Sequence, residues 1–325
     1  MSNVCLTGIS GQTGSYLAEL LLDKGHKVFG MVRKSSSFNT ERIDHIYNNP
    51  NLKLVYGDLS DAMSIVDFIT TAKPDLFFNL GGFSHVRASF DLPIVAMDVD
   101  GLGVMRCLEA IRKYSPHTKF LQASTSELFG DMPAPQDENT KFRPRSPYSI
   151  GKQMGFASVV NYREAYSIKA SNIISYNHES VRRPPTFIGR KITKTLCEIK
   201  LGLTDKLYLG CITSKRDFSH AKDICRAMSM ILDSDYADDY VVCSGESHSI
   251  EELLDIVASK LNLDWKKYVE FDKRLLRPTE VPHLLGDYSK IKNKLGWEPT
   301  ITFDELISEM VDHDLKLASK QANSG

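Results

Sequence analysis

The fold is decided by residues 4–32, which read VCLTGISGQTGSYLAELLLDKGHKVFGMV. Val4 to Leu6 is a short apolar run that predicts a strand, whereas Ser15 to Lys24 repeats its leucines at helical spacing and predicts a helix. Gly25 stands where a left-handed residue would end that helix, and Lys27 to Val32 predicts a second strand. This order of strand, glycine-rich loop, helix and strand is typical of a parallel α/β sheet.

The loop between the first strand and the helix contains three glycines, Gly8, Gly11 and Gly14. At this position of an α/β fold, backbone N–H groups and the positive end of a helix meet the pyrophosphate of a dinucleotide. We therefore predict a nucleotide-binding loop. The alternative is a glycine turn that serves only the close packing of helix and strand.

Strand and helix patterns keep alternating over the first half of the chain. Further strands are predicted at 52–56, 76–80, 119–123 and 170–176, and further helices at 61–72 and 94–114. The alternation predicts a Rossmann-type, doubly wound parallel sheet with helices on both faces.

The pattern loosens beyond residue 176. Helices are predicted at 187–201, 250–261 and 303–318, and a strand at 240–243. We expect residues 1–176 to form the Rossmann domain, and residues 177–325 to form mainly a smaller C-terminal α/β lobe from which some segments return to the sheet.

Composition excludes several classes of protein. The 325 residues are 42% hydrophobic and 25% charged, and 40 basic side chains face 41 acidic ones for a net charge of -1. Without an overall positive field we expect no nucleic-acid partner. No signal peptide and no apolar stretch of 18 residues is found, so we expect no membrane contact and a cytoplasmic location.

The cysteines lie far apart in the chain and form no C-x-x-C pair. They are Cys5, Cys107, Cys197, Cys211, Cys225 and Cys243. With no cluster of His and Cys at metal-ligand spacing, we expect a reducing compartment and no metal site.

Two cations follow the second strand, where a fold that binds NAD usually presents an acid to the ribose hydroxyls. Arg33 and Lys34, followed by Ser35 and Ser36, suit a 2′-phosphate and therefore predict NADP. A solvated basic turn is the alternative.

An aspartate follows the third strand. Asp58 is placed to accept a hydrogen bond from the adenine amino group. The alternative in this segment is capping of the following helix by Ser60 or Asp61.

Tyr148 and Lys152 lie four residues apart in a segment that Pro147 marks as the first turn of a helix. This spacing puts both side chains on one helical face. A phenol has a pKa of roughly 10, so it needs a nearby ammonium group to act as a base at neutral pH. Tyrosine and lysine at this spacing are common by chance, and the glycine-rich nucleotide loop is what makes the pair a catalytic candidate.

Hydroxyl and carboxyl groups follow the fifth strand, at the sheet edge where ligands bind in open α/β folds. Thr125 and Ser126 can bind a substrate oxygen, and Glu127 can take and return a proton. The alternative is a helix cap followed by an acid in the first turn.

Together these residues resemble the extended short-chain dehydrogenase/reductase superfamily and, within it, the GDP-mannose 4,6-dehydratase family. The resemblance covers nearly the whole chain. The matching stretches are Gly8 to Glu19, Val32 to Arg42, Tyr56 to Asp61, Gln122 to Gly130, Arg145 to Tyr148 with Lys152, Asn161 to Tyr166, Asn177 to Arg183, Lys215 to Asp223, Arg277 to Val281 and Leu295 to Pro299.

The resemblance implies a role for each matching position. It implies catalysis by Thr125, Glu127 and Tyr148, with Lys152 supporting the tyrosine. It places NADP contacts at Gly8, Ile9, Ser10, Gly11, Gln12, Thr13, Arg33, Lys34, Ser35, Ser36, Asp58, Leu59, Leu80, Gly81, Gly82, Phe83, Ser84, Lys152, His178 and Arg183. It places the GDP-sugar, in the C-terminal lobe, at Asn177, Lys191, Arg216, Arg277 and Glu280. Solvated surface cations are the alternative for the basic residues among them.

The chain departs from the family pattern at several positions. Phe83 stands where the family has a glutamine, Val95 where it has a tyrosine, and Thr13 where it has an aspartate. Residues 149–151, Ser-Ile-Gly, replace a family Gly-Ala-Ala before the catalytic lysine. Because Phe83 is expected near the sugar, GDP-D-glycero-mannoheptose is a second candidate substrate beside GDP-mannose.

We expect an NADP-dependent GDP-mannose 4,6-dehydratase, a lyase that forms GDP-4-keto-6-deoxymannose. A 4-keto sugar reductase or epimerase on the same fold would not need Glu127, and a regulatory protein that only senses NADP would not need Tyr148, Lys152 and Glu127 together. The resemblance further implies a homodimer or a homotetramer, in which the loop from Ser35 to Arg42 reaches a neighbour's cofactor.

Overall fold

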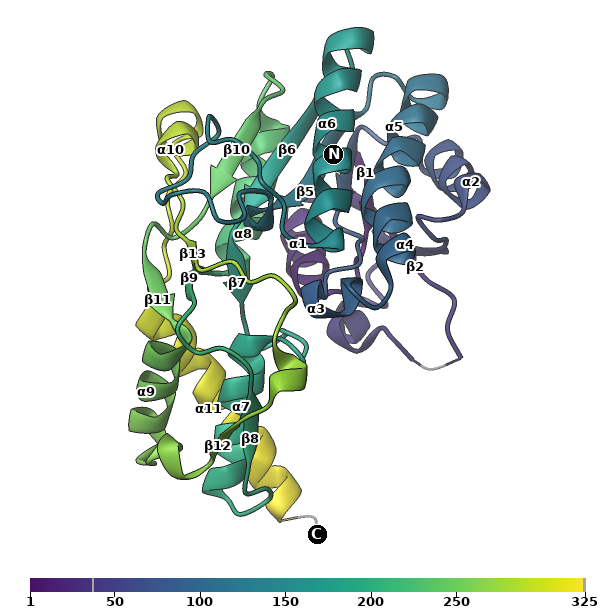
Figure 1. Ribbon diagram of the computed structural model, residues 1–325. Helices are drawn as coiled ribbons and strands as arrows, with labels where there is room; N and C mark the ends of the chain where they lie inside the picture. The colour runs from purple at the N-terminus through teal and green to yellow at the C-terminus, as the bar shows by residue number, and fades with distance from the viewer. Residues whose placement is uncertain (37, 324–325) are drawn as a thin grey trace.

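The computed structural model describes residues 1–36 and 38–323 and centres on a seven-stranded parallel sheet (Figure 1). The strand order is β10-β6-β5-β4-β1-β2-β3, and every neighbouring pair runs parallel. The strands are β1 (Asn3–Thr7), β2 (Lys27–Val32), β3 (Leu52–Tyr56), β4 (Leu76–Asn79), β5 (Lys119–Thr125), β6 (Ala170–Ser175) and β10 (Asp239–Val242). The predicted doubly wound Rossmann-type sheet is confirmed.

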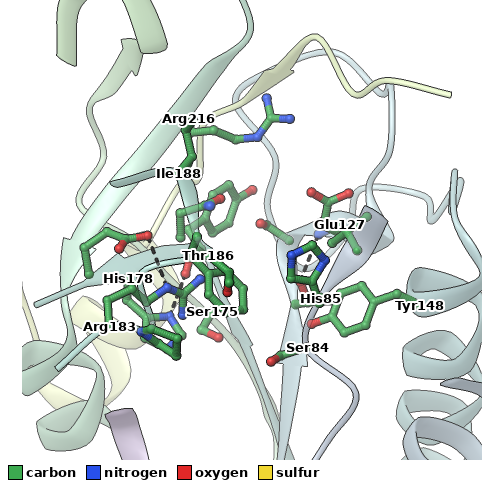
Figure 2. A pocket seen from close by; sticks show the side chains of 18 of the residues that line it. Ser84, His85, Glu127, Tyr148, Ser175, His178, Arg183, Thr186, Ile188 and Arg216 are labelled. Atoms are coloured by element: carbon green, nitrogen blue, oxygen red, sulfur yellow. Dashed lines mark hydrogen bonds and ion pairs between the residues drawn. The ribbon is translucent and has the colours of Figure 1, made fainter. Parts of the chain in front are cut away.

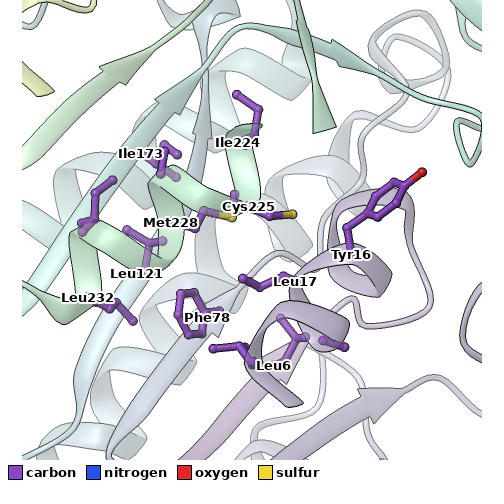
Figure 3. Packing of buried hydrophobic residues seen from close by; sticks show 14 of the residues in the cluster. Leu6, Tyr16, Leu17, Phe78, Leu121, Ile173, Ile224, Cys225, Met228 and Leu232 are labelled. Atoms are coloured by element: carbon purple, nitrogen blue, oxygen red, sulfur yellow. The ribbon is translucent and has the colours of Figure 1, made fainter. Parts of the chain in front are cut away.

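Helices cover both faces of this sheet because its strands are apolar on both sides. Successive residues Phe77 and Phe78 of β4 point to opposite faces, and both are fully buried. Phe78 belongs to a cluster with Leu17 and Met228, which lie on helices α1 (Gln12–Asp23) and α8 (Ala221–Asp233) (Figure 3). Phe77 belongs to the cluster on the other face, which is covered by α2 (Ala62–Ala72), α5 (Gly103–Tyr114) and α6 (Pro147–Tyr166).

The helix predicted at 94–114 is interrupted. The structure has α4 (Pro93–Met97), a wider π-helical turn η2 (Asp98–Leu102) and then α5. Gly101 in this turn lies close against α6, since a Cβ there would come within 2.7 Å of the Met154 sulfur. A π-helical turn contains one residue more than an α-helical turn, and helical periodicity over the segment did not reveal it. In this turn Asp100 is buried.

Several further boundaries differ from the prediction, and two of them lie next to candidate site residues. Helix α1 begins at Gln12 rather than at residue 15, because the glycine loop ends in Gly11 and the helix follows at once. Strand β5 continues two residues further, to Thr125, because its pairing with β6 extends to Ser175.

The second half of the chain builds a lobe beside the sheet (Figure 1). Its main sheet contains β7 (Asn177–Glu179), β9 (Lys215–His220), β11 (Ser247–Ser249) and β13 (His283–Leu284), and β8 (Leu207–Leu209) pairs with β12 (Val269–Phe271). Its helices are α7 (Ile188–Lys200), α9 (Ile250–Leu261) and α11 (Phe303–Ala322), which share one hydrophobic cluster.

Part of the second half returns to the large sheet. Strand β10 forms its edge, α8 covers one face, and α10 (Ser289–Leu295) contacts β10. The remaining short elements are η1 (Glu41–Ile46), α3 (Val86–Ser89), η3 (Ser126–Leu128), η4 (Trp265–Lys267) and η5 (Lys273–Leu275). Within the described residues, no helix is long and apolar enough to cross a membrane.

Candidate active site

A cleft of about 460 Å³ lies between the carboxyl ends of the sheet strands and the lobe. One wall in Figure 2 carries Glu127, Tyr148 and Ser84, and the facing wall carries His178 and Arg183. Most of the residues predicted from the sequence line this cleft. They are Gly8, Gly11, Gln12, Thr13, Leu80, Gly82, Ser84, Thr125, Ser126, Glu127, Tyr148, Lys152, Asn177, His178, Arg183, Lys191, Arg216, Arg277 and Glu280.

Ten predicted cofactor residues do not line the cleft. They are Ile9, Ser10, Arg33, Lys34, Ser35, Ser36, Asp58, Leu59, Gly81 and Phe83. Ile9 is fully buried in the core, whereas Arg33, Lys34, Ser35 and Ser36 are exposed after the end of β2. Ser37, in the serine-rich stretch of the family pattern, lies outside the described residues.

The glycine loop requires glycine for steric reasons. Gly8 has φ +70°, and a Cβ there would lie 2.9 Å from the Gly81 backbone nitrogen. A Cβ on Gly14 would lie 2.1 Å from the Gly8 carbonyl oxygen. Gly11 is the N-cap of α1 and offers no side chain to its first N–H groups. These free donors at a positive helix end fit a pyrophosphate.

Hydrogen bonds tie the glycine loop to the segment after β6. Gln12 Nε2 donates to the His178 carbonyl over 3.0 Å, and Ser180 Oγ donates to Gln12 Oε1 over 2.8 Å. His178 Nδ1 lies 2.9 Å from the Tyr176 carbonyl, an acceptor only, so Nδ1 is protonated and Nε2 accepts from the Thr13 hydroxyl over 2.9 Å. Burial, and then Arg183, lowers the pKa of His178 to about 4. The ring is therefore neutral at neutral pH.

The aspartates after β3 accept hydrogen bonds from neighbouring residues of the same loop. Asp58 Oδ1 accepts from the backbone N–H and the hydroxyl of Ser60 over 2.9 and 2.8 Å. Asp61 Oδ1 accepts from the Met63 N–H and caps α2, so the capping alternative holds for Asp61. After β2, the Lys34 ammonium group lies 4.6 Å from the centre of the Tyr56 ring.

Tyr148 and Lys152 enter the cleft from the first turns of α6. Ser146 and Ser149 cap this helix reciprocally, and Pro147 occupies its first turn. Lys152 Nζ lies 5.8 Å from the centre of the Tyr148 ring. Burial raises the pKa of Tyr148, while Lys152 and the Thr125 hydroxyl act in the opposite direction. The lysine thus offsets part of the cost of forming a phenolate here.

Asp100 is a site residue that the sequence analysis missed. Its Oδ1 lies 3.5 Å from Lys152 Nζ and accepts from the Phe83 N–H over 3.0 Å. Burial lowers the pKa of Lys152, but Asp100 raises it and the balance is upward. The sequence did contain a signal for this residue, because an acidic side chain at position 100 lies on the same helical face as the apolar Val104 and Cys107, which are buried.

Phe83 faces the site with its backbone. Its N–H donates to Asp100, and its side chain is not among those that line the cleft. The effect of the Phe83 ring on the sugar pocket stays a prediction. Val95, the second departure, is 46% exposed and also lies outside the cleft lining.

The turn after β5 carries both a cap and an acid. Thr125 Oγ1 accepts from the Glu127 N–H over 3.2 Å, so the capping alternative is correct for the threonine hydroxyl. Glu127 is mostly buried, and its Oε1 accepts from Arg277 Nη1 over 3.1 Å. The side chains of Thr125 and Glu127 both line the cleft beside Tyr148. Thr125 therefore caps the turn and is still accessible from the cleft.

A row of alternating charges crosses the cleft from this acid. Arg277 Nη1 also lies 3.6 Å from Glu280 Oε1, which accepts from Arg216 Nη2 over 3.1 Å. Burial lowers the pKa of Arg277, but Glu127 and Glu280 raise it and the balance is upward. Lys191 lines the same cleft. Two arginines and a lysine suit a diphosphate.

Arg183 lies on the opposite wall. Its Nε is 3.4 Å from Glu179 Oε1, and its guanidinium group is 3.8 Å from the centre of the Phe187 ring. Burial raises the pKa of Glu179, which Arg183 lowers in part. Among residues 1–36 and 38–323, no His, Cys, Asp and Glu side chains gather in a group that could hold a metal ion.

Comparison with known sequences identifies close relatives of this chain. The family model described as GDP-mannose 4,6 dehydratase matches residues 5–310. GDP-mannose 4,6 dehydratase 1 of Arabidopsis thaliana is 48% identical over 97% of this chain and 90% of its own length. The GDP-mannose 4,6 dehydratase of Homo sapiens is 45% identical over 99% of this chain and 94% of its own length.

Comparison with solved structures supports the fold. A dTDP-glucose 4,6-dehydratase from Bacillus anthracis has a TM-score of 0.87 at 23% identity and covers 99% of this chain and 100% of its own. A UDP-glucose 4-epimerase from Thermus thermophilus has a TM-score of 0.83 at 24% identity, over 96% of this chain and 98% of its own. Both share the same α/β architecture.

Proposed function

This chain belongs to the GDP-mannose 4,6-dehydratase family, and from that premise we propose that it converts GDP-mannose to GDP-4-keto-6-deoxymannose with NADP as its cofactor. One observation carries the proposal: Glu127 opens into the same cleft as Tyr148 and Lys152. A reductase or an epimerase needs the tyrosine and the lysine, whereas elimination of water also needs a group that removes a carbon-bound proton.

The first step is oxidation at C4 of the hexose. Tyr148, as a phenolate stabilised by Lys152, takes the proton of the C4 hydroxyl, and Thr125 holds that oxygen by a hydrogen bond. A nicotinamide held on the glycine-loop side of the cleft would supply reversible hydride transfer for this oxidation and for the later reduction at C6. The ammonium group of Lys152 meanwhile offsets part of the cost of the negative phenolate in its buried position.

The second step is elimination of water across C5 and C6. The ketone at C4 makes the C5 proton acidic, and Glu127 removes it. The same carboxyl group then gives this proton to the C6 hydroxyl, which leaves as water. When the hydride reaches C6, the proton that Tyr148 took from the C4 hydroxyl goes to C5, so Tyr148 ends as a phenolate again. Glu127 follows the end of β5 and lines the cleft beside Tyr148.

The proposed cofactor site runs from the cleft to the end of β2. The cradle of Gly8 and Gly14, in which a Cβ would collide with backbone, fits a pyrophosphate, and the neutral His178 ring fixes Thr13 beside it. Arg33 and Lys34 supply positive charge for a 2′-phosphate at the ribose end. NADP is thus our proposal for the cofactor, with Asp58 nearest to the adenine.

The proposed substrate site occupies the lobe side of the cleft. Arg216, Arg277 and Lys191 bind the diphosphate, and Asn177 and Ser126 bind neutral parts of the GDP-sugar. In this division residues 1–176 hold the cofactor and the catalytic groups, and residues 177–325 hold mainly the nucleotide sugar. We propose GDP-mannose rather than GDP-D-glycero-mannoheptose as the substrate, because the relatives that match this chain are named GDP-mannose 4,6 dehydratases.

The proposed assembly is a homodimer or a homotetramer. Several large apolar side chains on and beside α4 and α6 are exposed, which is unusual for a face that stays in water. They are Leu92, Ile94, Val95, Leu102 and Ile150, with exposed fractions from 43% to 78%.

The decisive experiment follows one hydrogen atom. Incubation of the full chain with NADP and GDP-mannose deuterated at C4 should give a product deuterated at C6, without consumption of added NADPH. A C6 label that comes from solvent, or turnover that consumes NADPH in equal amounts, would instead establish a reductase. A chain that binds NADP and GDP-mannose without turnover would establish a cofactor-sensing protein.

A further inference from the structure

His85 stands at the beginning of the short helix α3, on the loop that follows β4. Its Nδ1 accepts from the Ala88 N–H over 3.2 Å and caps this helix. An imidazole nitrogen that accepts a hydrogen bond carries no proton, so the neutral ring has its proton on Nε2. The cap therefore fixes which ring nitrogen can donate.

The surroundings of His85 keep the ring neutral and in place. The ring packs on Phe187 of the lobe, with 5.6 Å between ring centres. Burial lowers the pKa of His85, a hydrogen bond with its own backbone raises it in part, and the positive charges of Arg277, Arg183 and Arg87 lower it, so the balance is downward. At neutral pH the side chain is thus an uncharged donor, although it lies in an arginine-rich cleft.

The helix that His85 caps is tied to the candidate catalytic tyrosine. Ser89 Oγ, in the last turn of α3, accepts from the Tyr148 backbone N–H over 3.1 Å. His85 and Tyr148 both line the cleft, and Figure 2 shows the imidazole in the same part of it as Glu127 and Tyr148. Among residues 1–36 and 38–323, none accepts a hydrogen bond from His85 Nε2.

We propose that His85 is a further substrate-binding residue, whose Nε2–H donates a hydrogen bond to a hydroxyl group of the hexose. The inference rests on the function proposed above and adds a determinant of sugar recognition to it. A neutral donor suits a hydroxyl group, whereas the guanidinium groups of Arg216 and Arg277 suit the diphosphate. A site that donates to a substrate hydroxyl discriminates against a ligand that lacks it, because the buried donor is then left unpaired.

Two amide substitutions separate this role from the cap. In His85→Asn the amide oxygen is close to the position of Nδ1 and can still cap α3, but the side chain ends short of Nε2. In His85→Gln the amide nitrogen reaches the position of Nε2 and can donate, while the cap is lost. His117→Asn, on an exposed loop outside the cleft, is the control for the loss of a histidine.

Binding is measured by calorimetry with GDP-mannose and with GDP alone, together with kcat, KM and Tm. We expect His85→Asn to keep the wild-type Tm and affinity for GDP, and to lose about 10- to 100-fold in affinity for GDP-mannose and in kcat/KM. His85→Gln should recover most of that loss and melt at a lower temperature than His85→Asn, and His117→Asn should match the wild type.

The results distinguish this inference from the proposed function. If His85→Asn binds GDP-mannose as the wild type does, or if GDP and GDP-mannose lose affinity equally, His85 does not contact the sugar. If His85→Asn loses affinity for GDP-mannose together with a lower Tm, and His85→Gln recovers none of that affinity, His85 serves only to cap α3. If the wild type binds GDP-mannose more tightly than GDP but does not dehydrate it, the proposed function fails, and the loss of that difference in His85→Asn still supports the sugar contact.

Discussion

Arg277 Nη1 lies 3.1 Å from Glu127 Oε1, so the cation proposed to hold the diphosphate contacts the carboxylate proposed to remove the C5 proton. Glu127 follows β5 of the large sheet and Arg277 follows η5 of the lobe, so the ion pair crosses the cleft. A diphosphate beside Arg277 competes with Glu127 for the same guanidinium group. In the proposed mechanism, nucleotide binding and the position of the base are therefore coupled.

Arg277→Gln should weaken the binding of GDP by about 1.5–3 kcal/mol, the usual value of a hydrogen bond to a charged group. Glutamine keeps an N–H donor for Glu127 but removes the positive charge. Calorimetric titration with GDP measures the loss. Arg274→Gln is the matched control, because Arg274 is 90% exposed and pairs with Asp272 outside the cleft lining. An equal loss in both variants would contradict the assignment of Arg277 to the diphosphate.

Glu127→Gln should stop dehydration while leaving the oxidation at C4 intact, because an amide cannot accept the C5 proton. Transient absorbance of reduced nicotinamide should still appear after mixing with GDP-mannose, but no 4-keto-6-deoxy product should form. Tyr148→Phe should lose both signals. Product formation by Glu127→Gln at the wild-type rate would assign the C5 proton to another group.

Arg33→Ala should weaken the binding of NADP by about 1.5–3 kcal/mol and leave the binding of NAD nearly unchanged. Arg33 follows β2 at the edge where the ribose is proposed to lie, and only NADP carries a phosphate there. Lys27→Ala removes an exposed cation from the opposite end of the same strand and should affect neither cofactor. Equal losses for NADP and NAD in Arg33→Ala would refute the 2′-phosphate contact.

Phe83→Gln should leave the ratio of kcat/KM for GDP-mannose and GDP-D-glycero-mannoheptose unchanged, because the Phe83 side chain lies outside the cleft lining. The backbone N–H that donates to Asp100 is present in either residue. Competition between the two sugars in one reaction measures the ratio directly. A shift of the ratio would instead confirm the expectation from the family pattern that this position selects the sugar.

His178 should make the fold less stable as the pH falls. Its pKa is about 4 in the folded protein and near 6.5 when unfolded, so the unfolded chain binds the extra proton between these values. The free energy of unfolding should therefore decrease as the pH falls from about 6.5 to about 4. Urea unfolding across this range should show a smaller decrease in His178→Gln, and an identical decrease in both proteins would contradict the assignment.

The chain determines much of its fold through patterns that are local in sequence. The glycines of residues 8–14 and the helical and strand periods around them predict the parallel sheet, because steric demands at Gly8 and Gly14 and burial on both faces leave few other folds. Tyr148 and Lys152 were found in the same way, since a spacing of four residues within one helix fixes their common face.

Tertiary structure alone decides which of these groups meet. Asp100 reaches Lys152 through a π-helical turn, and His85 reaches the cleft through a loop, neither of which helical or strand periodicity reveals. The ion pair of Glu127 and Arg277 joins residues 150 positions apart. Such contacts depend on how the lobe packs against the sheet, and that packing sums many weak interactions between distant segments, whereas a sequence period reports only on neighbours within one helix or strand.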